Sequence, residues 1–299
     1  MNNGSIINYG FEFTIDATPI KTKIWELNIG GNISLNRNKI ASIGDGGEYG
    51  KLLVAPGRTV MTNYFYGNSL TNATGGGANI NIFAEGYPMG MFYGYKTAGI
   101  IQSGDYAGGI NYVDSNEDGK IDINDRVIIG NPNPDFTYGF NIALSYKRWT
   151  LTADFVGSYG NEIFNMNNLR EYDTSTYAYN VRKVAVTQAW SETNKSGKFP
   201  ALGSLTSTDR ERFSDRCIED GSYLRLANLS LSYSFPFDRK NFVKGLDVGL
   251  NVSNVFILTK YSGWDPDVSS YGSSVMIMGV DSNSYPVSRI FSIDFKFLF

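Results

Sequence analysis

The final segment of the chain alternates between large apolar and smaller polar residues. The apolar residues at every second position are Phe291, Ile293, Phe295, Phe297 and Phe299. A period of two places these side chains on one face of an extended strand and leaves Ser292, Asp294 and Lys296 on the other face. We therefore predict a β-strand that runs to the last residue and has one apolar face.

Six further segments repeat this period of two. They lie at residues 7–15, 25–35, 136–146, 149–155, 229–235 and 246–252. The longer ones have the roughly 9–11 residues that a tilted strand needs to cross a bilayer, whereas strands of globular proteins are commonly about 5–6 residues long. Their polar positions are mostly small and uncharged, as in a crowded or water-filled barrel lumen. The pattern favours an all-β fold with a transmembrane antiparallel β-barrel segment over a soluble β-sandwich, which alternates in the same way.

Aromatic residues stand at the ends of several predicted strands. Examples are Tyr146, Trp149, Tyr233 and Phe235, in a chain that is 14% aromatic. Membrane barrels carry girdles of aromatic residues at both interfaces. We interpret these positions as part of such a girdle.

The connections between the predicted strands alternate in length. Short connections lie at 17–22, 147–148 and 236–243, and long ones lie at 37–135, 161–221 and 257–286. Outer-membrane barrels have short periplasmic turns and long extracellular loops in this alternation. If the last strand ends on the periplasmic side, the alternation holds only when region 37–135 contains either no spanning strand or two.

The composition excludes most enzyme chemistry. The chain has no histidine and one cysteine, Cys217, so it lacks the residues for Ser-His-Asp and Cys-His catalysis and for zinc sites built on imidazole or several thiolates. We expect no enzymatic activity and an inert, packed Cys217. The net charge of −3 provides no broad basic surface for nucleic acid. No apolar run of about 18 residues predicts a spanning helix.

Residues 114–125, DSNEDGKIDIND, have the spacing of a calcium-binding loop. The candidate ligands are Asp114, Asn116, Asp118, the backbone carbonyl of Lys120, Asp122 and Asp125. Gly119 stands at the position of the sharp turn, and Asp125 replaces the longer glutamate that usually ends such loops. We predict a structural Ca²⁺ that stiffens the loop. The alternative is an Asp-rich and Asn-rich turn that stays solvated.

Four strings of the sequence resemble one known family. They are EGYPMGMFYGYKTAGI, YVDSNEDGKIDINDRVIIGNPNPDFTYGFN, SDRCIEDGSYLRLANLSLSYSFP and YSGWDPDV, followed by a C-terminal Phe299. In this order they resemble the C-terminal portion of SusC/RagA-type TonB-dependent transporters of the Bacteroidetes outer membrane, over nearly the whole chain. The resemblance implies part of a 22-stranded barrel with long extracellular loops.

The resemblance also implies a function and a set of partners. The function is import of oligosaccharides or peptides across the outer membrane of a Gram-negative cell, energised by the TonB complex through an N-terminal plug domain. A SusD-like surface lipoprotein would close over the long loops as a lid. The barrel-assembly machinery would recognise residues 291, 293, 295, 297 and 299, named above, as an insertion signal, and the barrel would contact outer-membrane lipid.

Aromatic residues of the long loops are candidates for contact with the substrate or the lid. They are Tyr172, Tyr177, Trp190 and Trp264. Their rings can stack on a sugar or contact a peptide, and packing within the loops is the alternative. In the same loops we expect Glu219 and Asp220 to form a solvated strand entrance.

The sequence also departs from the family pattern. No plug domain, TonB box or signal peptide is recognised, and seven predicted strands do not build a 22-stranded wall. We therefore expect residues 1–299 to be a fragment, or one piece of a split transporter, that supplies C-terminal barrel strands. Two alternatives stay open. One is a secreted, calcium-stabilised β-sandwich for glycan binding or adhesion. The other is a small self-closing barrel with an eighth strand within 37–135.

Overall fold

A single antiparallel sheet of seven strands dominates the fold. The computed structural model describes residues 4–71, 77–175, 180–237, 242–268, 270 and 274–299. The sheet has the order β1-β2-β12-β13-β16-β17-β19. Its strands are β1 (Ser5–Lys21), β2 (Trp25–Ser42), β12 (Phe136–Tyr146), β13 (Trp149–Tyr159), β16 (Tyr223–Pro236), β17 (Gly245–Thr259) and β19 (Ile290–Leu298). The seven predicted segments are confirmed as seven neighbouring strands.

Several of these strands extend beyond the predicted segments. β1 continues to Lys21 and β2 begins at Trp25, so the first short connection comprises residues 22–24 and not 17–22. The register between β1 and β2 shifts between Ala17 and Ile20. A shift of this kind interrupts the strict alternation, which explains why the pattern of period two ended at residue 15 in the sequence. At its other end β2 reaches Ser42, which lies inside region 37–135 that we expected to be a loop.

Rows of apolar residues cross the whole sheet on one face. One row, read from β1 to β19, is Ala17, Ile29, Ile142, Ala153, Leu229, Val252 and Phe291. The next row is Ile20, Leu27, Leu144, Leu151, Leu231, Leu250 and Ile293. Between them, on the opposite face, lie Asn28, Ala143, Thr152, Ser230, Asn251 and Ser292. The register therefore turns seven alternating segments into one continuous apolar band, as a lipid-facing barrel wall requires.

An aromatic row borders this band at the end of the sheet that carries the short turns. Trp25, Tyr146, Trp149 and Tyr233 are consecutive cross-strand neighbours in this row. The rings of Trp25 and Tyr146 are 4.2 Å apart between centroids, and those of Trp149 and Tyr233 are 4.7 Å apart. Aromatic side chains with a polar tip are favoured at a membrane interface. The structure thus assembles the girdle positions predicted from the sequence into a line.

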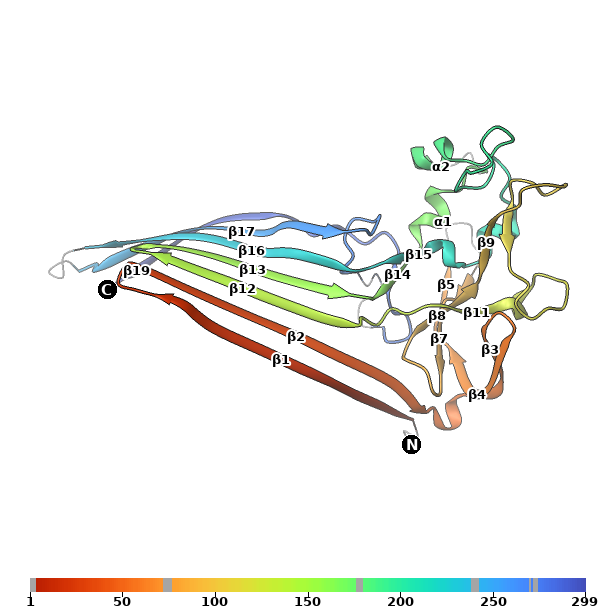
Figure 1. Ribbon diagram of the computed structural model, residues 1–299, viewed down its shortest axis with the longest axis horizontal. Coiled ribbons are helices and arrows are strands. Elements are labelled where there is room, and N and C mark those ends of the chain that lie inside the picture. The colour runs from red at the N-terminus through yellow and green to blue at the C-terminus, as the bar shows by residue number, and fades with distance from the viewer. Residues whose placement is uncertain (1–3, 72–76, 176–179, 238–241, 269, 271–273) are drawn as a thin grey trace.

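The connections separate by length to opposite ends of the sheet. Figure 1 shows the strand ends that the short connections join, between β1 and β2, β12 and β13, and β16 and β17, at one end of the sheet together with the C-terminus. The large connections lie at the other end. We call the described residues of 43–135, 160–222 and 260–289 the head. No strand from the described residues of 43–135 joins the seven-stranded sheet, so of the two alternatives for this region the structure has no spanning strand. An eighth strand for a self-closing barrel is likewise absent from these residues.

Small sheets and short helices build the head. A five-stranded sheet has the order β11-β8-β7-β4-β3, with β3 (Glu48–Ala55), β4 (Arg58–Tyr66), β7 (Asn81–Ala84), β8 (Met91–Tyr95) and β11 (Arg126–Gly130). Two pairs are β5 (Ser69–Thr71) with β6 (Gly77–Asn79) and β9 (Thr97–Ile100) with β10 (Ile110–Tyr112). A three-stranded sheet holds β14 (Glu162–Asn165), β15 (Ile218–Asp220) and β18 (Val280–Asp281). The α-helices are α1 (Asn167–Glu171), α2 (Lys183–Thr187) and α3 (Ser207–Glu211), and the 3₁₀ turns are η1 (Gly44–Gly46), η2 (Ile123–Asp125) and η3 (Asp215–Cys217).

The buried hydrophobic core lies in the head and joins all three long connections. Its main cluster contains Leu70, Ile80, Phe92, Val127, Ile129, Phe164, Met166, Phe213, Cys217, Ile277 and Val280. A core drawn from three loops fixes their mutual positions because burial of apolar surface is the main favourable term in folding. The long loops of the sequence are therefore one packed unit. Among the described residues, no helix is long and apolar enough to cross a membrane.

Candidate functional site

The three-stranded sheet brings the second and third long connections together. β14 pairs with β15 of the same connection and, in parallel, with β18 of the next one. Glu219 of β15 lies at this junction. Its carboxylate accepts hydrogen bonds from the side-chain amides of Asn165 (3.0 Å) and Asn168 (2.6 Å), and from the backbone N–H (2.8 Å) and hydroxyl (2.8 Å) of Ser262. The expectation of a solvated strand entrance is wrong for Glu219, because its oxygens bind three segments of the head.

A second carboxylate, that of Asp281, helps to hold the third long connection in place. The Tyr261 hydroxyl donates to Asp281 at 2.6 Å, and both residues are buried. Burial and this hydrogen bond raise the pKa of Tyr261, which keeps the hydroxyl protonated as a donor. Nearby, the backbone N–H of Asn283 donates to the Asn167 side chain at 3.0 Å. The segment that begins at Tyr261 is thus attached to β18 and α1.

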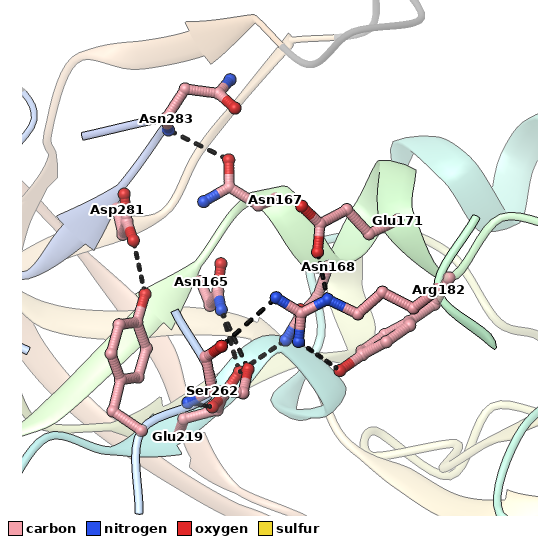
Figure 2. Close-up of polar contacts among 11 residues, drawn as sticks. Asn165, Asn167, Asn168, Glu171, Arg182, Glu219, Ser262, Asp281 and Asn283 are labelled. Atoms are coloured by element: carbon pink, nitrogen blue, oxygen red, sulfur yellow. Dashed lines mark hydrogen bonds and ion pairs between the residues drawn. The ribbon is translucent and has the colours of Figure 1, made fainter. Parts of the chain in front are cut away.

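Arg182 connects α1 with this segment. Its Nε pairs with the Glu171 carboxylate, and its guanidinium also donates to the Tyr172 hydroxyl (3.4 Å) and to the backbone carbonyl of Ser262 (3.2 Å). Figure 2 shows the Arg182 side chain extending toward Glu171 and Ser262. The positive charge is therefore matched by Glu171, while about a third of the Arg182 side chain, 32%, stays exposed.

Trp264 projects from the anchored segment into solvent. Its side chain is 78% exposed, although Tyr261 and Asp265 on either side are buried. A cavity of about 490 Å³ lies beside the ring and is lined by Glu171, Asn180, Val181, Arg182, Ser262, Gly263 and Trp264. Volumes of about 300–1,000 Å³ are usual for small-molecule sites. An exposed tryptophan on a rigid segment beside such a cavity is the best candidate in the head for contact with a ligand or a partner.

Asp265 attaches this segment to the barrel wall. Its carboxylate pairs with Arg225 of β16 at 2.6 Å, and both side chains are less than a tenth exposed. Arg225 also donates to the Asn254 side chain of β17 at 3.4 Å. The register of β16 against β17 shifts between Leu226 and Asn228, and Asn254 opposite this shift has a positive φ of 54°. The bulge therefore lies beside the pair that holds the Trp264 segment.

The other predicted aromatic contacts differ in their placement. Tyr172 is half-buried against Arg182 and Phe199, with ring centroids 4.7 Å apart in the latter pair. Trp190 is only 6% exposed and its indole N–H donates to Gln102 at 3.0 Å. For Trp190 the prediction of a surface contact is wrong, because the ring packs within the head. Tyr177 lies outside the described residues.

The calcium-like loop is folded back onto its own backbone. Asp114 accepts hydrogen bonds from the N–H groups of Asp118 (3.2 Å) and Gly119 (2.7 Å), and Gly119 has a positive φ of 83°. Asp125, with no exposed surface, accepts from the N–H groups of Ser115 (2.8 Å), Asn116 (3.4 Å) and Asp122 (2.7 Å). Among the described residues, no three carboxylate, imidazole or thiol groups converge as a metal site. The loop has the turn of a calcium loop, while its carboxylates bind backbone N–H groups.

The residues of the predicted assembly signal lie on one face of the edge strand β19 and at its end. Phe291, Ile293, Phe295, Phe297 and Phe299 are all more than half exposed. β19 pairs on one side with β17 and is the last strand of the seven-stranded sheet. The period of two thus leaves an apolar edge strand whose role in assembly stays a prediction.

Sequence reasoning missed the residues that position Trp264. Arg182, Arg225, Asp265 and Asp281 gave no signal, because each finds its partner between 11 and 40 positions away in the sequence. Polar residues within the apolar strand pattern were the one available clue. Arg225 is a charged residue four positions before the predicted strand segment 229–235, and a charge buried at such a place requires a partner.

Together these features define a class. A single antiparallel sheet with one apolar face, an aromatic row at its turn end and a packed head of long connections is the architecture of an outer-membrane β-barrel segment.

No protein-family model matches the chain. The chain is 30% identical over 316 residues to TonB-dependent receptor P3 of Formosa agariphila, and the match covers 100% of this chain and 29% of the relative. It is 29% identical over 301 residues to TonB-dependent receptor SusC of Bacteroides thetaiotaomicron, covering 100% and 27%.

Solved structures agree with these relatives. The RagAB peptide transporter matches with a TM-score of 0.72 and 25% identity, over 97% of this chain and 29% of that chain. The RagAB peptide importer in its open-open state matches with a TM-score of 0.72 and 26% identity, over 99% and 29%. The chain spans about three tenths of the length of the curated relatives that it matches.

The family resemblance stated from the sequence is confirmed. The homologues of this chain are TonB-dependent receptors of the SusC/RagA type, and the chain corresponds to a barrel portion of them, consistent with their C-terminal part. TonB-dependent receptors are outer-membrane proteins, so the outer membrane is the location of this chain. The relatives are receptors and transporters and not enzymes, in agreement with the expectation from the residues that the chain lacks.

Proposed function

We propose that this chain forms part of the wall and the outer vestibule of an importer for oligosaccharides or peptides. The import is TonB-dependent, with the TonB complex acting through a plug domain and a SusD-like lipoprotein closing over the head as a lid. The open edges of the seven-stranded sheet, β1 and β19, support a wall that is completed by further strands. An unpaired strand edge in a bilayer leaves backbone groups without hydrogen-bond partners.

The observation that carries the proposal is the rigid presentation of Trp264. Trp264 is 78% exposed, and the segment that carries it is held by Asp281, Glu219 and Arg225, so the backbone loses little conformational freedom when a substrate or lid covers the ring. Such preorganised aromatic anchors account for much of the affinity of many interfaces. Trp264 together with the neighbouring cavity is therefore the contact that we assign to the substrate or the lid.

Growth and binding experiments on the complete receptor test this assignment. Cells that carry the receptor with Trp264→Ala are expected to insert it normally and to grow at least several-fold more slowly on the oligosaccharide or protein hydrolysate that requires the wild-type receptor. Tyr285→Ala is the matched control, because Tyr285 is 88% exposed in the same connection but is not part of the Trp264 cavity. Deletion of the receptor with no growth defect on either nutrient class would refute the import function itself.

For the loop 114–125 we propose a structural Ca²⁺. The support is the spacing of its oxygen-bearing residues and the turn at Gly119. Binding would require Asp114 and Asp118 to direct carboxylate oxygens toward the ion. The expected benefit is a stiffer loop at the edge of the vestibule, and no chemical step depends on the ion.

A further inference from the structure

A cavity of about 30 Å³ lies inside the head where three segments meet. β10 contributes Tyr112, α1 contributes Asn168, and the segment that includes η3 contributes Ser214 and Arg216. A water molecule requires about 10–15 Å³ of such volume. The cavity therefore has room for one or two water molecules and none for an organic ligand.

Two buried polar atoms at this cavity make no well-formed hydrogen bond among the described residues, although the Asp209 carboxylate lies near the first of them. They are the Tyr112 hydroxyl and the Asn168 Oδ1, and both are inaccessible to solvent. Asn168 is only 4% exposed. Its amide orientation is fixed, because Nδ2 donates to Glu219 at 2.6 Å and a carboxylate can only accept. Buried polar atoms without a protein partner are typically satisfied by ordered water.

The hydrogen-bonding chemistry of these two atoms determines which small species can fill the cavity. Burial raises the pKa of Tyr112, so its hydroxyl stays protonated and can donate. Asn168 Oδ1 can only accept. The lining also carries one carboxylate, Asp209, and three guanidinium groups, Arg210, Arg212 and Arg216. A small anion that accepted from Tyr112 would still meet the lone pairs of Asn168 Oδ1, and a metal cation could not accept from the Tyr112 hydroxyl. Water donates and accepts at once, and it is small enough for the volume.

We propose that ordered water occupies this cavity and links β10 with α1 through Tyr112 and Asn168. The site goes beyond the import function and does not depend on it. A larger cavity of about 760 Å³ shares Ile110, Tyr112, Asp209 and Arg212 with the small one. The two cavities are therefore neighbours, and Tyr112, one of the two residues that the water binds, lines both of them.

A structure of the complete receptor in detergent, at a resolution that shows ordered water, tests the proposal. The expected result is a peak within hydrogen-bond range of both the Tyr112 hydroxyl and Asn168 Oδ1. An empty cavity, or a direct protein hydrogen bond that satisfies both atoms, would overturn it. Data collected after exchange of chloride for bromide distinguish water from a small anion. An anomalous bromide peak at the site would also overturn the proposal.

Variants give a second measurement that does not depend on density alone. Tyr112→Phe removes the donor and keeps the ring, so hydrogen exchange at the N–H of Val113, which donates to Lys96 at 3.0 Å, should rise about threefold to tenfold. Tyr106→Phe is the control, because Tyr106 is exposed in the same hairpin. Equal exchange rates in wild type and Tyr112→Phe would contradict a linking role for the water.

Discussion

Arg225 of the barrel wall and Asp265 of the loop that carries Trp264 form a buried ion pair of 2.6 Å. The pair is the one direct charged connection between a wall strand and this loop among the described residues. Because both side chains are withdrawn from water, each depends on the other to offset its loss of hydration. The position of Trp264 in the vestibule is therefore tied to the position of the wall.

Breaking this pair should release the loop. Arg225→Ala leaves Asp265 buried without its partner, which costs about 3–5 kcal/mol in comparable cases. We expect faster hydrogen exchange and proteolysis across residues 260–268, with the seven-stranded sheet intact. Arg37→Ala is the control, since the Arg37–Asp135 pair is 43% and 57% exposed and such pairs contribute about 0–1 kcal/mol. Similar effects of the two substitutions would show that the Arg225–Asp265 pair does not anchor the loop.

Calcium should protect the loop 114–125 from proteolysis if the proposed ion binds there. We expect Asp114→Ala or Asp118→Ala to loosen residues 103–135 and to leave the barrel segment intact. The measurement is protease sensitivity of the complete receptor with Ca²⁺ and with chelator, and Asp105→Ala, in the nearby hairpin, serves as the control. Identical cleavage with and without chelator in the wild type would contradict the calcium proposal.

Asp125 should stabilise the same loop without calcium. Its carboxylate accepts three backbone N–H groups and is fully buried. Asp125→Ala leaves these donors unsatisfied, and hydrogen bonds to charged groups contribute about 1.5–3 kcal/mol each. We expect exchange of the N–H groups of residues 115, 116 and 122 to accelerate even in the presence of chelator. Protection that depends on Ca²⁺ alone would refute this role.

The terminal aromatic residue should matter for assembly more than for the stability of the assembled barrel. Phe299→Ala is expected to lower the amount of receptor inserted in the outer membrane severalfold, measured as heat-modifiable, membrane-extracted protein. Phe242→Ala is the matched control, because its ring lies 5.2 Å from that of Phe299 and is 83% exposed. Equal loss of insertion for both variants would indicate lost packing at this contact and not a lost signal.

The buried thiol predicts a pH dependence. Burial raises the pKa of Cys217 from 9.0 to about 12, so the folded head holds this proton more tightly than the unfolded chain does. Stability contributed by the neutral thiol is complete below about pH 9 and is lost as pH rises toward 12. We expect negligible labelling by iodoacetamide at pH 8 until the head unfolds. Cys217→Ala should remove this part of the alkaline destabilisation, and rapid labelling of the folded receptor would contradict it.

The sequence determined the wall. Because each strand has to bury one face in lipid, apolar residues recur at every second position within each segment. The sequence alone therefore predicts the seven strands, their apolar face and the aromatic ends at Tyr146 and Trp149. The alternation of short and long connections is equally local. These features follow from residues that are neighbours in the chain, and the structure confirms them.

Only the tertiary structure decided how the long connections fold and which of their residues reach solvent. Residues such as Phe92, Phe164 and Ile277 pack in one core although they are far apart in sequence, and no local period announces such a core. Trp190 and Trp264 are both tryptophans of long connections, and no local sequence pattern distinguishes them. In the structure Trp190 is buried and Trp264 is 78% exposed. The difference arises from long-range partners, Gln102 for Trp190 and Arg225 with Asp265 for the Trp264 loop, and pairing over such distances is set by the fold.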